Sequence, residues 1–449
     1  MAVIEEHSEG DENDVNQEND RNRVVEDRDS LIALDQAVTS LHIVATAGPE
    51  DDSEEEEDEE EDEVWGGGGL KGFLQKPDDP WKVLRQYFPS KAGGAPAWLD
   101  PVNVPRAKQA SCGICDKPLQ FALQVYAPVD DDETAFHRTV YVFICTSLAC
   151  LQQDLSQQGR KEKRKRSIKI FRNQLPRQNG YYSAEPPKTD GSETPLCAGA
   201  PLCSWCGTWK GDKVCGGCKQ TRYCSQTHQM DHWRERHAPV CREAQEKLKA
   251  RESSTNASSS SESDIEVIDS PSSAQPASLS LWPEFELIVD ESGEDDEEDS
   301  DGGLDGRDGV GRLLSEYENL RRQGREQFSS KDVQDVEESS AEEQHWAAFQ
   351  ARVSKTPEQV IWYLRSAAAK PLWPRLDGQP KVTDIPVCSR CGGERIFEFQ
   401  ILPQLLYFFK IKDDPDSLDW GTIAVYSCAK SCPVEGYCEE FAWVQPGFS

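Results

Sequence analysis

The chain has 449 residues, of which 36% are hydrophobic and 29% are charged, and its formal net charge is −33. The length allows two or three domains, but the low apolar content means that part of the chain cannot form a core. No apolar run approaches the length of a membrane span, and the N-terminus is acidic and unlike a signal peptide, so we expect neither a membrane nor a secreted protein. In the reducing interior of a cell, clustered cysteines bind metal more often than they form disulfides, and this chain has 16 of them.

The acidic residues are concentrated in two segments. Residues 1–63 carry 25 acids and 3 bases, with thirteen acids among the fourteen positions 50–63. Residues 252–345 carry 27 acids and 6 bases, so these segments have net charges of −22 and −21 and the rest of the chain carries +10. Like charges at this density keep the backbone solvated, which predicts a disordered acidic tail over 1–63. Zinc-bound thiolates would reduce the remaining positive charge, so we do not expect a nucleic-acid surface.

Residues 64–196 are predicted to form an N-terminal β-unit. Two segments, 121–126 and 139–144, are rich in aromatic and β-branched residues and are predicted as strands. The basic run at 160–166 is interpreted either as a nuclear import signal or as a solvated loop.

Residues 197–245 contain a compact Cys/His cluster. Its candidate ligands, in four pairs, are Cys203, Cys206, Cys215, Cys218, Cys224, His228, His237 and Cys241. A two-residue gap lets both thiolates of a tight turn face one ion, and a three-residue gap puts two ligands one helical turn apart on the same face. Eight ligands are what two tetrahedral zinc ions need. So short a segment cannot bury a sufficient core by itself, so we expect zinc to supply much of its folding energy.

A linker and a second β-rich unit follow. Ser, Asp, Glu and Pro dominate from 252 to about 308, and we predict a mostly disordered acidic linker over 246–345 with an amphipathic helix around 313–320. Thr356 and Pro357 resemble an N-cap and an N1 residue, with Gln359 at N3, which predicts the start of a helix. The last sixty residues are again rich in strand-forming residues, so 346–449 is predicted as a C-terminal β-unit.

The two β-units share an internal repeat. Each begins with a Cys-x2-Cys pair, has Phe and Gln at nine and twelve residues past the first cysteine, and later reaches a hydrophobic strand that ends in cysteine. The corresponding residues are Cys112, Cys115, Phe121, Gln124 and Cys145 in the first unit and Cys388, Cys391, Phe397, Gln400 and Cys428 in the second. The predicted fold is therefore β-rich α+β, with a duplicated sandwich-like β-unit, an inserted zinc finger and disordered acidic segments.

Each β-unit also contains four cysteines suited to one zinc ion. The quartets are Cys112, Cys115, Cys145 and Cys150, and Cys388, Cys391, Cys428 and Cys432. Each joins a cysteine knuckle to a pair at a strand end, as in zinc ribbons. The alternative is that these are buried free thiols, because cysteine packs readily in β-cores. Cys197 and Cys438 are left over and are interpreted as packing residues.

The central cluster, with Tyr223 and Trp233, resembles the MYND zinc finger. This resemblance implies interleaved ligands, with Cys203, Cys206, Cys224 and His228 on one ion and Cys215, Cys218, His237 and Cys241 on the other. The usual sixth ligand of that finger is cysteine, and here His228 takes its place; neutral imidazole binds zinc equally well. His232 falls outside the ligand spacing and is expected at the surface.

The flanking segments carry a second resemblance. They include residues 91–99, 124–128, 136–138, 171–177, 391–393, 397–400, 403–406 and 420–422. With the finger between them they resemble the programmed cell death protein 2 family over roughly 64–245 and 346–449. The resemblance implies a dedicated chaperone of a newly made small-subunit ribosomal protein, supporting small-subunit assembly in cytoplasm and nucleus. A ribosomal protein without its RNA is strongly basic, so the acidic segments either screen it or only keep this chain soluble.

The motifs of common enzymes are not found: there is no phosphate loop, dinucleotide fingerprint, G-x-S-x-G elbow or H-E-x-x-H pair. Each ligand set is closed by four protein groups, which is typical of structural zinc. We therefore expect a non-enzymatic protein that holds a client in a groove between or beside the β-units. Trp98, Tyr126 and Phe399 either line such a groove or belong to the core. The rival hypotheses are an adaptor that binds proline-containing peptides and a zinc-dependent ubiquitin ligase; we expect no membrane partner and no direct nucleic-acid binding.

Overall fold

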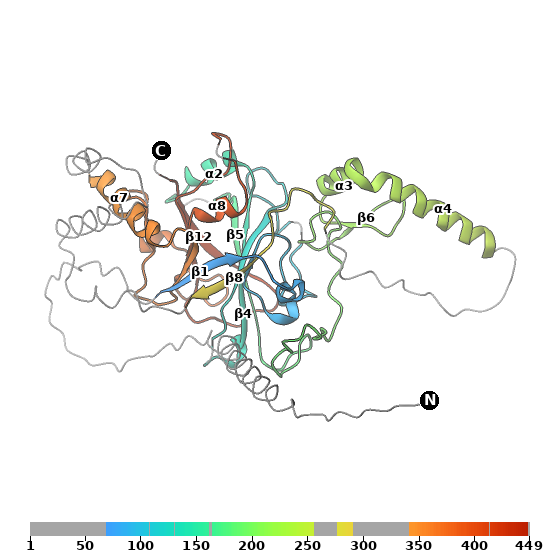
Figure 1. Ribbon diagram of the computed structural model, residues 1–449, viewed down its shortest axis with the longest axis horizontal. Coiled ribbons are helices and arrows are strands. Elements are labelled where there is room, and N and C mark those ends of the chain that lie inside the picture. The colour runs from blue at the N-terminus through green and yellow to red at the C-terminus, as the bar shows by residue number, and fades with distance from the viewer. Residues whose placement is uncertain are drawn as a thin grey trace, which may run out of the picture.

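The computed structural model describes residues 69–106, 108–129, 131–160, 164–255, 276–290, 341–412 and 414–447. The predicted tail over 1–63, the helix predicted around 313–320 and most of the predicted linker lie outside these ranges. Within the described part of the chain, ten strands close into one barrel in the order β1-β8-β2-β3-β4-β5-β12-β11-β10-β9, and all neighbours are antiparallel (Figure 1).

The barrel strands come from both ends of the chain. Their bounds are β1 (Leu70–Gln75), β2 (Lys91–Ala92), β3 (Gln120–Tyr126), β4 (His137–Ile144), β5 (Ile168–Leu175), β8 (Phe285–Asp290), β9 (Gln359–Tyr363), β10 (Arg395–Ile401), β11 (Thr422–Cys428) and β12 (Cys438–Gln445). A separate two-stranded sheet, β6 (Lys213–Val214) with β7 (Arg222–Tyr223), lies in the inserted finger.

The described helices lie between the barrel strands in the chain or belong to the inserted finger and its continuation. The α-helices are α2 (Leu148–Leu155), α3 (Gln226–His232), α4 (Ala238–Thr255), α7 (Ala341–Lys355) and α8 (Gln404–Phe408). The shorter helical turns are η1 (Pro80–Val83), η2 (Arg85–Tyr87), η3 (Glu133–Ala135) and η6 (Val382–Asp384), and η4 (Trp233–His237) is a π-helix. Figure 1 shows α3 and α4 on one side of the barrel and α7 on the other.

Residue alternation explains how one strand serves two cores. On β4, Val140, Val142 and Ile144 belong to the cluster inside the barrel, while Tyr141 and Phe143 belong to a second cluster on its outer face. Side chains of a strand point alternately to opposite faces of a sheet, so both faces of β4 are buried. This is why residues 140–144 of the strand form a continuous apolar run.

The predicted duplication is confirmed. In β3 the pairing register shifts just after Phe121, and in β10 it shifts just after Phe397, the equivalent position. The side chain of Gln124 binds the backbone at Ala97: Ala97 N–H donates to Gln124 Oε1 at 2.8 Å. Gln400 makes the same contact with Leu372 at 2.5 Å.

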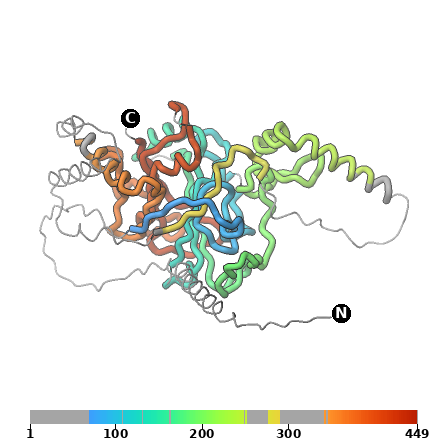
Figure 2. Tube along the Cα trace, in the orientation of Figure 1, coloured from blue at the N-terminus to red at the C-terminus, as the bar shows by residue number. Residues whose placement is uncertain are grey.

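The two β-units form one body (Figure 2). The β3-β4-β5 and β12-β11-β10 strands meet where β5 pairs with β12, with Cys438 opposite Arg172 and Glu440 opposite Ile170. The other end of the sheet is closed by β1 and β8, which pair with β9 and β2. A duplicated unit of this kind would leave exposed strand edges by itself, and closure removes them.

Two sequence predictions need correction here. Residues 276–290 fall inside the predicted linker, yet they include β8, whose Phe285 and Leu287 are buried in the barrel. The helix predicted from Thr356 is wrong, because α7 ends at Lys355 and β9 begins at Gln359. The run of β9 is Gln-Val-Ile-Trp-Tyr, whose β-branched and aromatic residues favour pairing with β1 and β10 over the local cap signal.

Candidate metal centres

The structure brings the sixteen predicted ligands together in four groups of four. They are Cys112, Cys115, Cys145 and Cys150; Cys203, Cys206, Cys224 and His228; Cys215, Cys218, His237 and Cys241; and Cys388, Cys391, Cys428 and Cys432. Within each group all four ligand atoms lie within 4.8 Å of one another. The finger groups are interleaved along the chain, as the MYND resemblance implies.

The distances within the groups fit zinc. The Sγ atoms of Cys115 and Cys145 are 3.7 Å apart, and those of Cys391 and Cys428 are 3.6 Å apart. Four sulfurs about 2.3 Å from a tetrahedral zinc ion would be separated by roughly 3.8 Å. A disulfide would need about 2.05 Å, and all the cysteines are free. The donor set and its spacing therefore support zinc binding.

All four Cys-x2-Cys turns share one backbone design. The fourth residue after the first cysteine has a positive φ, and its N–H donates to the carbonyl of that cysteine at 2.7 to 3.0 Å. These residues are Asp116 (φ 58°), Gly207 (φ 65°), Lys219 (φ 57°) and Gly392 (φ 70°). The turn points both thiolates of a knuckle in one direction, which is the geometry one ion needs. Glycine is easiest at positive φ, so Gly207 and Gly392 were a signal that the sequence analysis missed.

One helical segment supplies ligands to both groups of the finger. His228 lies in α3, His237 lies in the π-helix and Cys241 lies in α4, and these elements follow one another without a break. His228 points its Nδ1 at Cys224 Sγ, 3.1 Å away, whereas His237 points its Nε2 at Cys215 Sγ, 3.3 Å away. The sequence spacing gave no indication of which ring nitrogen each histidine presents.

The thiols of a group compete for protons. Hydrogen bonds with Cys206 and Cys224 hold the pKa of Cys203 far below its ordinary value, and the same kind of contact raises the pKa of Cys224 far above it. Burial alone would lower the pKa of His228, but its contacts with Cys203 and Cys206 raise it to about 10. Adjacent thiolates repel one another, so a divalent cation is what allows a whole group to be deprotonated.

The prediction for His232 is wrong, because this residue is buried rather than at the surface. Its Nδ1 lies 3.1 Å from the Tyr223 hydroxyl, and its ring lies 5.0 Å from that of His237. Burial lowers the pKa of His232 to about 4, with a smaller contribution from His237. A neutral His232 therefore packs between the two ligand groups of the finger as part of its small core.

The finger is docked on the outer face of the N-terminal β-unit. Trp209 is fully buried, its ring lies 4.3 Å from that of Phe143, and its Nε1 donates to the Leu119 carbonyl at 2.9 Å. In return Trp98 of the β-unit donates to the Thr208 carbonyl of the finger at 2.7 Å. The finger cysteines and the barrel aromatics form one buried cluster.

The remaining predicted positions lie as follows. Trp98 and Phe399 are buried in the core, so neither lines a groove. Tyr126 is half-buried, with its hydroxyl 2.9 Å from Nδ1 of His137. Cys197 is half-buried and Cys438 is buried, and neither belongs to a ligand group. No helix within the described ranges is long and apolar enough to cross a membrane.

The fold and these sites define a β-barrel protein with an inserted zinc finger. Residues 203–241 match the MYND finger, residues 70–189 match the N-terminal domain of programmed cell death protein 2, and residues 343–446 match its C-terminal domain. The programmed cell death protein 2 of Bos taurus is 34% identical over 373 residues, covering 81% of this chain and 93% of the relative. That of Rattus norvegicus is 33% identical over 375 residues with the same coverage.

A further relative is the programmed cell death protein 2-like protein of Homo sapiens, which is 27% identical over 368 residues, covering 78% of this chain and 88% of the relative. No solved structure matches. The chain belongs to the programmed cell death protein 2 family, which confirms the resemblance found in the sequence.

Proposed function

We propose that this chain is a non-enzymatic zinc protein that chaperones a newly made small-subunit ribosomal protein and so supports small-subunit biogenesis. The observation that carries this proposal is family membership, because both family domains and the finger between them are present in one chain. The chaperone role is what that family resemblance implies.

The ligand groups support a structural role for the metal. Each group offers four protein ligands, which completes a tetrahedral zinc shell and leaves no coordination position for water or substrate. We propose four zinc ions, two in the finger and one in each β-unit. Such ions would stiffen the turns that frame the barrel and would make a rigid surface for a partner, rather than a catalytic site.

The charge distribution supports a basic client. The acidic runs at 50–63 and 291–301 would attract a ribosomal protein that has not yet met its RNA. We expect that deleting both runs lowers the amount of soluble client at low salt and has a smaller effect at high salt, because salt screens such attraction. If deletion changes client solubility in neither condition, the runs serve only the solubility of this chain.

We further propose that the protein works in both cytoplasm and nucleus. The basic run at 160–166 would act as the import signal, although Arg166 is partly engaged: it lies 3.3 Å from Asp154 and donates to the Ala442 carbonyl at 2.6 Å. Replacing Lys161, Lys163 and Lys165 with Ala in a fluorescent fusion tests this. Unchanged nuclear signal would indicate a loop, or import carried by the client.

One observation favours a second candidate, an adaptor that binds proline-containing peptides. Met230, Trp233 and Val240, all on the helical segment of the finger, are exposed. Exposed apolar side chains that are not needed for packing can mark a docking surface.

Affinity purification of the full-length chain followed by mass spectrometry distinguishes the candidates. A single dominant ribosomal protein of the small subunit supports the chaperone. Several chromatin or signalling factors would support the adaptor, and an E2 enzyme would support the ligase that the sequence analysis also considered. Substituting Trp233 with Ala provides the control, because only the adaptor hypothesis predicts that this variant loses its partners.

A further inference from the structure

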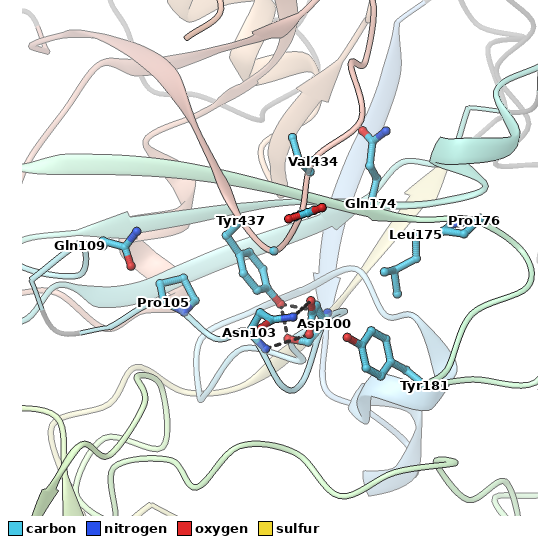
Figure 3. A pocket seen from close by; sticks show the side chains of 12 residues that line it. Asp100, Asn103, Pro105, Gln109, Gln174, Leu175, Pro176, Tyr181, Val434 and Tyr437 are labelled. Carbon is cyan, nitrogen blue, oxygen red and sulfur yellow. Dashed lines mark hydrogen bonds between the residues drawn. The ribbon is translucent and has the colours of Figure 1, made fainter. Parts of the chain in front are cut away.

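A pocket of about 580 Å³ lies where the two β-units meet (Figure 3). The first unit supplies the loop around Asp100, the end of β5 and the segment that contains Tyr181, and the second unit supplies the loop before β12 with Glu435 and Tyr437. The volume is in the range of sites that enclose a small ligand or several side chains. The pocket is separate from the four ligand groups, whose residues do not line it.

The walls of the pocket are held in place before any ligand binds. The Tyr437 hydroxyl accepts a hydrogen bond from Asp100 N–H at 3.0 Å and donates one to the Asp100 carbonyl at 2.9 Å. The Tyr437 ring packs edge-on against buried Trp98, 4.7 Å away. The neighbouring Gly436 carbonyl accepts a hydrogen bond from the Asn173 amide of β5. A wall fixed in this way loses little conformational entropy when a ligand binds.

The pocket is acidic and partly aromatic. Its lining includes the carboxylates of Asp100 and Glu435 and, among the residues that the structure describes, no Lys or Arg. The Asp100 carboxylate is buried and held by its own loop: Oδ1 accepts from Val102 N–H at 3.0 Å and Asn103 N–H at 2.9 Å, and Oδ2 accepts from Asn103 Nδ2 at 2.8 Å. Glu435 is exposed and therefore accessible to a ligand. Figure 3 shows Tyr181 and Tyr437 on opposite sides of Asp100, and both rings are half-buried.

We propose that this pocket binds an arginine side chain in an extended segment of the client. A guanidinium stacks on tyrosine rings and forms a two-pronged hydrogen bond with a carboxylate. This pocket presents the half-buried rings of Tyr181 and Tyr437 and the exposed carboxylate of Glu435. Gln109 also lines the pocket, and its exposed amide would suit the polar backbone of an extended peptide. Lysine fits less well, because its compact, strongly hydrated ammonium neither stacks on a ring as a planar group nor forms a bidentate hydrogen bond with a carboxylate.

The inference rests on the proposed function, since a basic client is what makes arginine the expected ligand. The binding site would then lie where the two β-units meet. Glu435 supplies the accessible negative charge. The Tyr437 side chain is held by hydrogen bonds with Asp100 and by packing on Trp98, so Tyr181 is the ring better suited to stack on a ligand.

The test measures how the full-length zinc-loaded chain binds a short fluorescein-labelled peptide with arginines spaced by uncharged residues. Matched peptides carry lysine or neutral citrulline at the same positions. We expect Glu435→Gln and Tyr181→Ala each to weaken arginine-peptide binding about five-fold, the effect of losing one partly exposed charge or stacking contact. The control Glu439→Gln removes an exposed carboxylate of β12 that does not line the pocket, and it should leave binding unchanged.

Equal binding of the arginine and citrulline peptides would overturn the proposal, and so would equal effects of Glu435→Gln and Glu439→Gln. A lysine peptide that binds as tightly as the arginine peptide would overturn the choice of arginine. Co-purification of the client with the same variants distinguishes failure of the pocket assignment from failure of the proposed chaperone function. If the wild-type chain recovers a small-subunit ribosomal protein but does not bind the arginine peptide, the pocket assignment fails and the chaperone function stands.

Discussion

The buried ion pair between Arg138 and Glu398 allows a quantitative test of how the two β-units are joined. Arg138 comes from β4 of the first unit and Glu398 from β10 of the second, and both side chains are 0% exposed. The guanidinium forms a two-pronged contact, with Nη1–Oε1 at 2.5 Å and Nη2–Oε2 at 2.8 Å. Nη2 also donates to Ser427 at 3.1 Å, and the Tyr363 hydroxyl donates to Glu398 at 3.3 Å.

Replacing Arg138 with Met keeps much of the side-chain volume and removes the charge. Glu398 would then be a fully buried carboxylate without its bidentate partner. It would be left with a long hydrogen bond from Tyr363, a contact with Ser427 and the charge of Arg365. Burial alone would raise the pKa of Glu398, and Arg138 is the main reason that it lies well below its ordinary value. Removing one partner of a buried pair costs about 3–5 kcal/mol of unfolding free energy. The double variant Arg138→Met/Glu398→Leu should recover most of this loss, because no buried charge remains unpaired.

The matched control is Lys247→Met, which removes the cation of an ion pair on the surface of α4. Its partner is Glu243, 2.7 Å away, with side chains 72% and 66% exposed. Because solvent screens this exposed pair, its removal should leave the free energy of unfolding nearly unchanged. The two substitutions are chemically similar and differ mainly in burial.

Urea unfolding of the zinc-loaded proteins, followed by tryptophan fluorescence, measures the differences in stability. Hydrogen exchange at β4 and β10 shows whether the loss is local to the contact between the units. The expectation fails if Arg138→Met costs no more unfolding free energy than Lys247→Met, or if the double variant is less stable than the single one. Either result would mean that the pair does not hold the units together.

Four further substitutions, the first with a matched control, test the metal centres, the docked finger and a buried histidine. Cys428→Ser should lower the zinc content by one ion per chain in elemental analysis, whereas Cys438→Ser, at a buried cysteine outside the ligand groups, should leave it unchanged. Trp209→Ala should keep the finger's zinc but cost about 3–5 kcal/mol and speed proteolysis beside the finger, because a fully buried indole is lost. Lys219→Gly should stabilise the chain by about 0.5–1 kcal/mol in thermal unfolding, because Lys219 has φ 57°. Burial, with a smaller effect of Arg177, lowers the pKa of His137 to about 4 from an ordinary value near 6.5. Its neutral form thus stabilises the fold above pH 6.5, and this contribution is lost as the pH falls toward 4, so His137→Gln should flatten the dependence of stability on pH across that window.

The sequence predicted the finger well because its information is local. Ligand gaps of two and three residues are set by turn and helix geometry, so Cys203 and Cys206, or His237 and Cys241, could be paired without knowing the fold. The same holds for the Phe and Gln offsets of the repeat, which mark the register shift of β3 and β10. Ring-nitrogen choice and the burial of His232 depend on packing across the finger, and no short-range pattern contains that information.

The closure of the barrel could not be predicted for a different reason. Antiparallel pairing of β5 with β12 joins strands that are far apart in sequence. The alternation of residues along a strand does not indicate which other strand will pair with its edge. Composition also led to the inclusion of β8 in the predicted linker, because its six apolar and acidic residues are surrounded by a long acidic, Ser-rich stretch. At Thr356 a genuine local cap signal lost to the pairing of β9 with two neighbours, as tertiary context commonly overrides propensity.

The position of β8 ties the finger to the barrel. The chain that leaves the finger returns to it before entering β8: Ala277 N–H donates to the Ser204 carbonyl at 3.1 Å and Ser278 N–H donates to that of Trp205 at 2.9 Å. From there β8 pairs with both β1 and β2, and so completes the closed sheet. Ser204 and Trp205 lie inside the Cys203–Cys206 knuckle, so the metal that orders this turn also orders the approach to β8. The insertion therefore contacts both the outer face of the barrel and the segment that enters β8, so zinc bound in the finger would also fix the start of that segment.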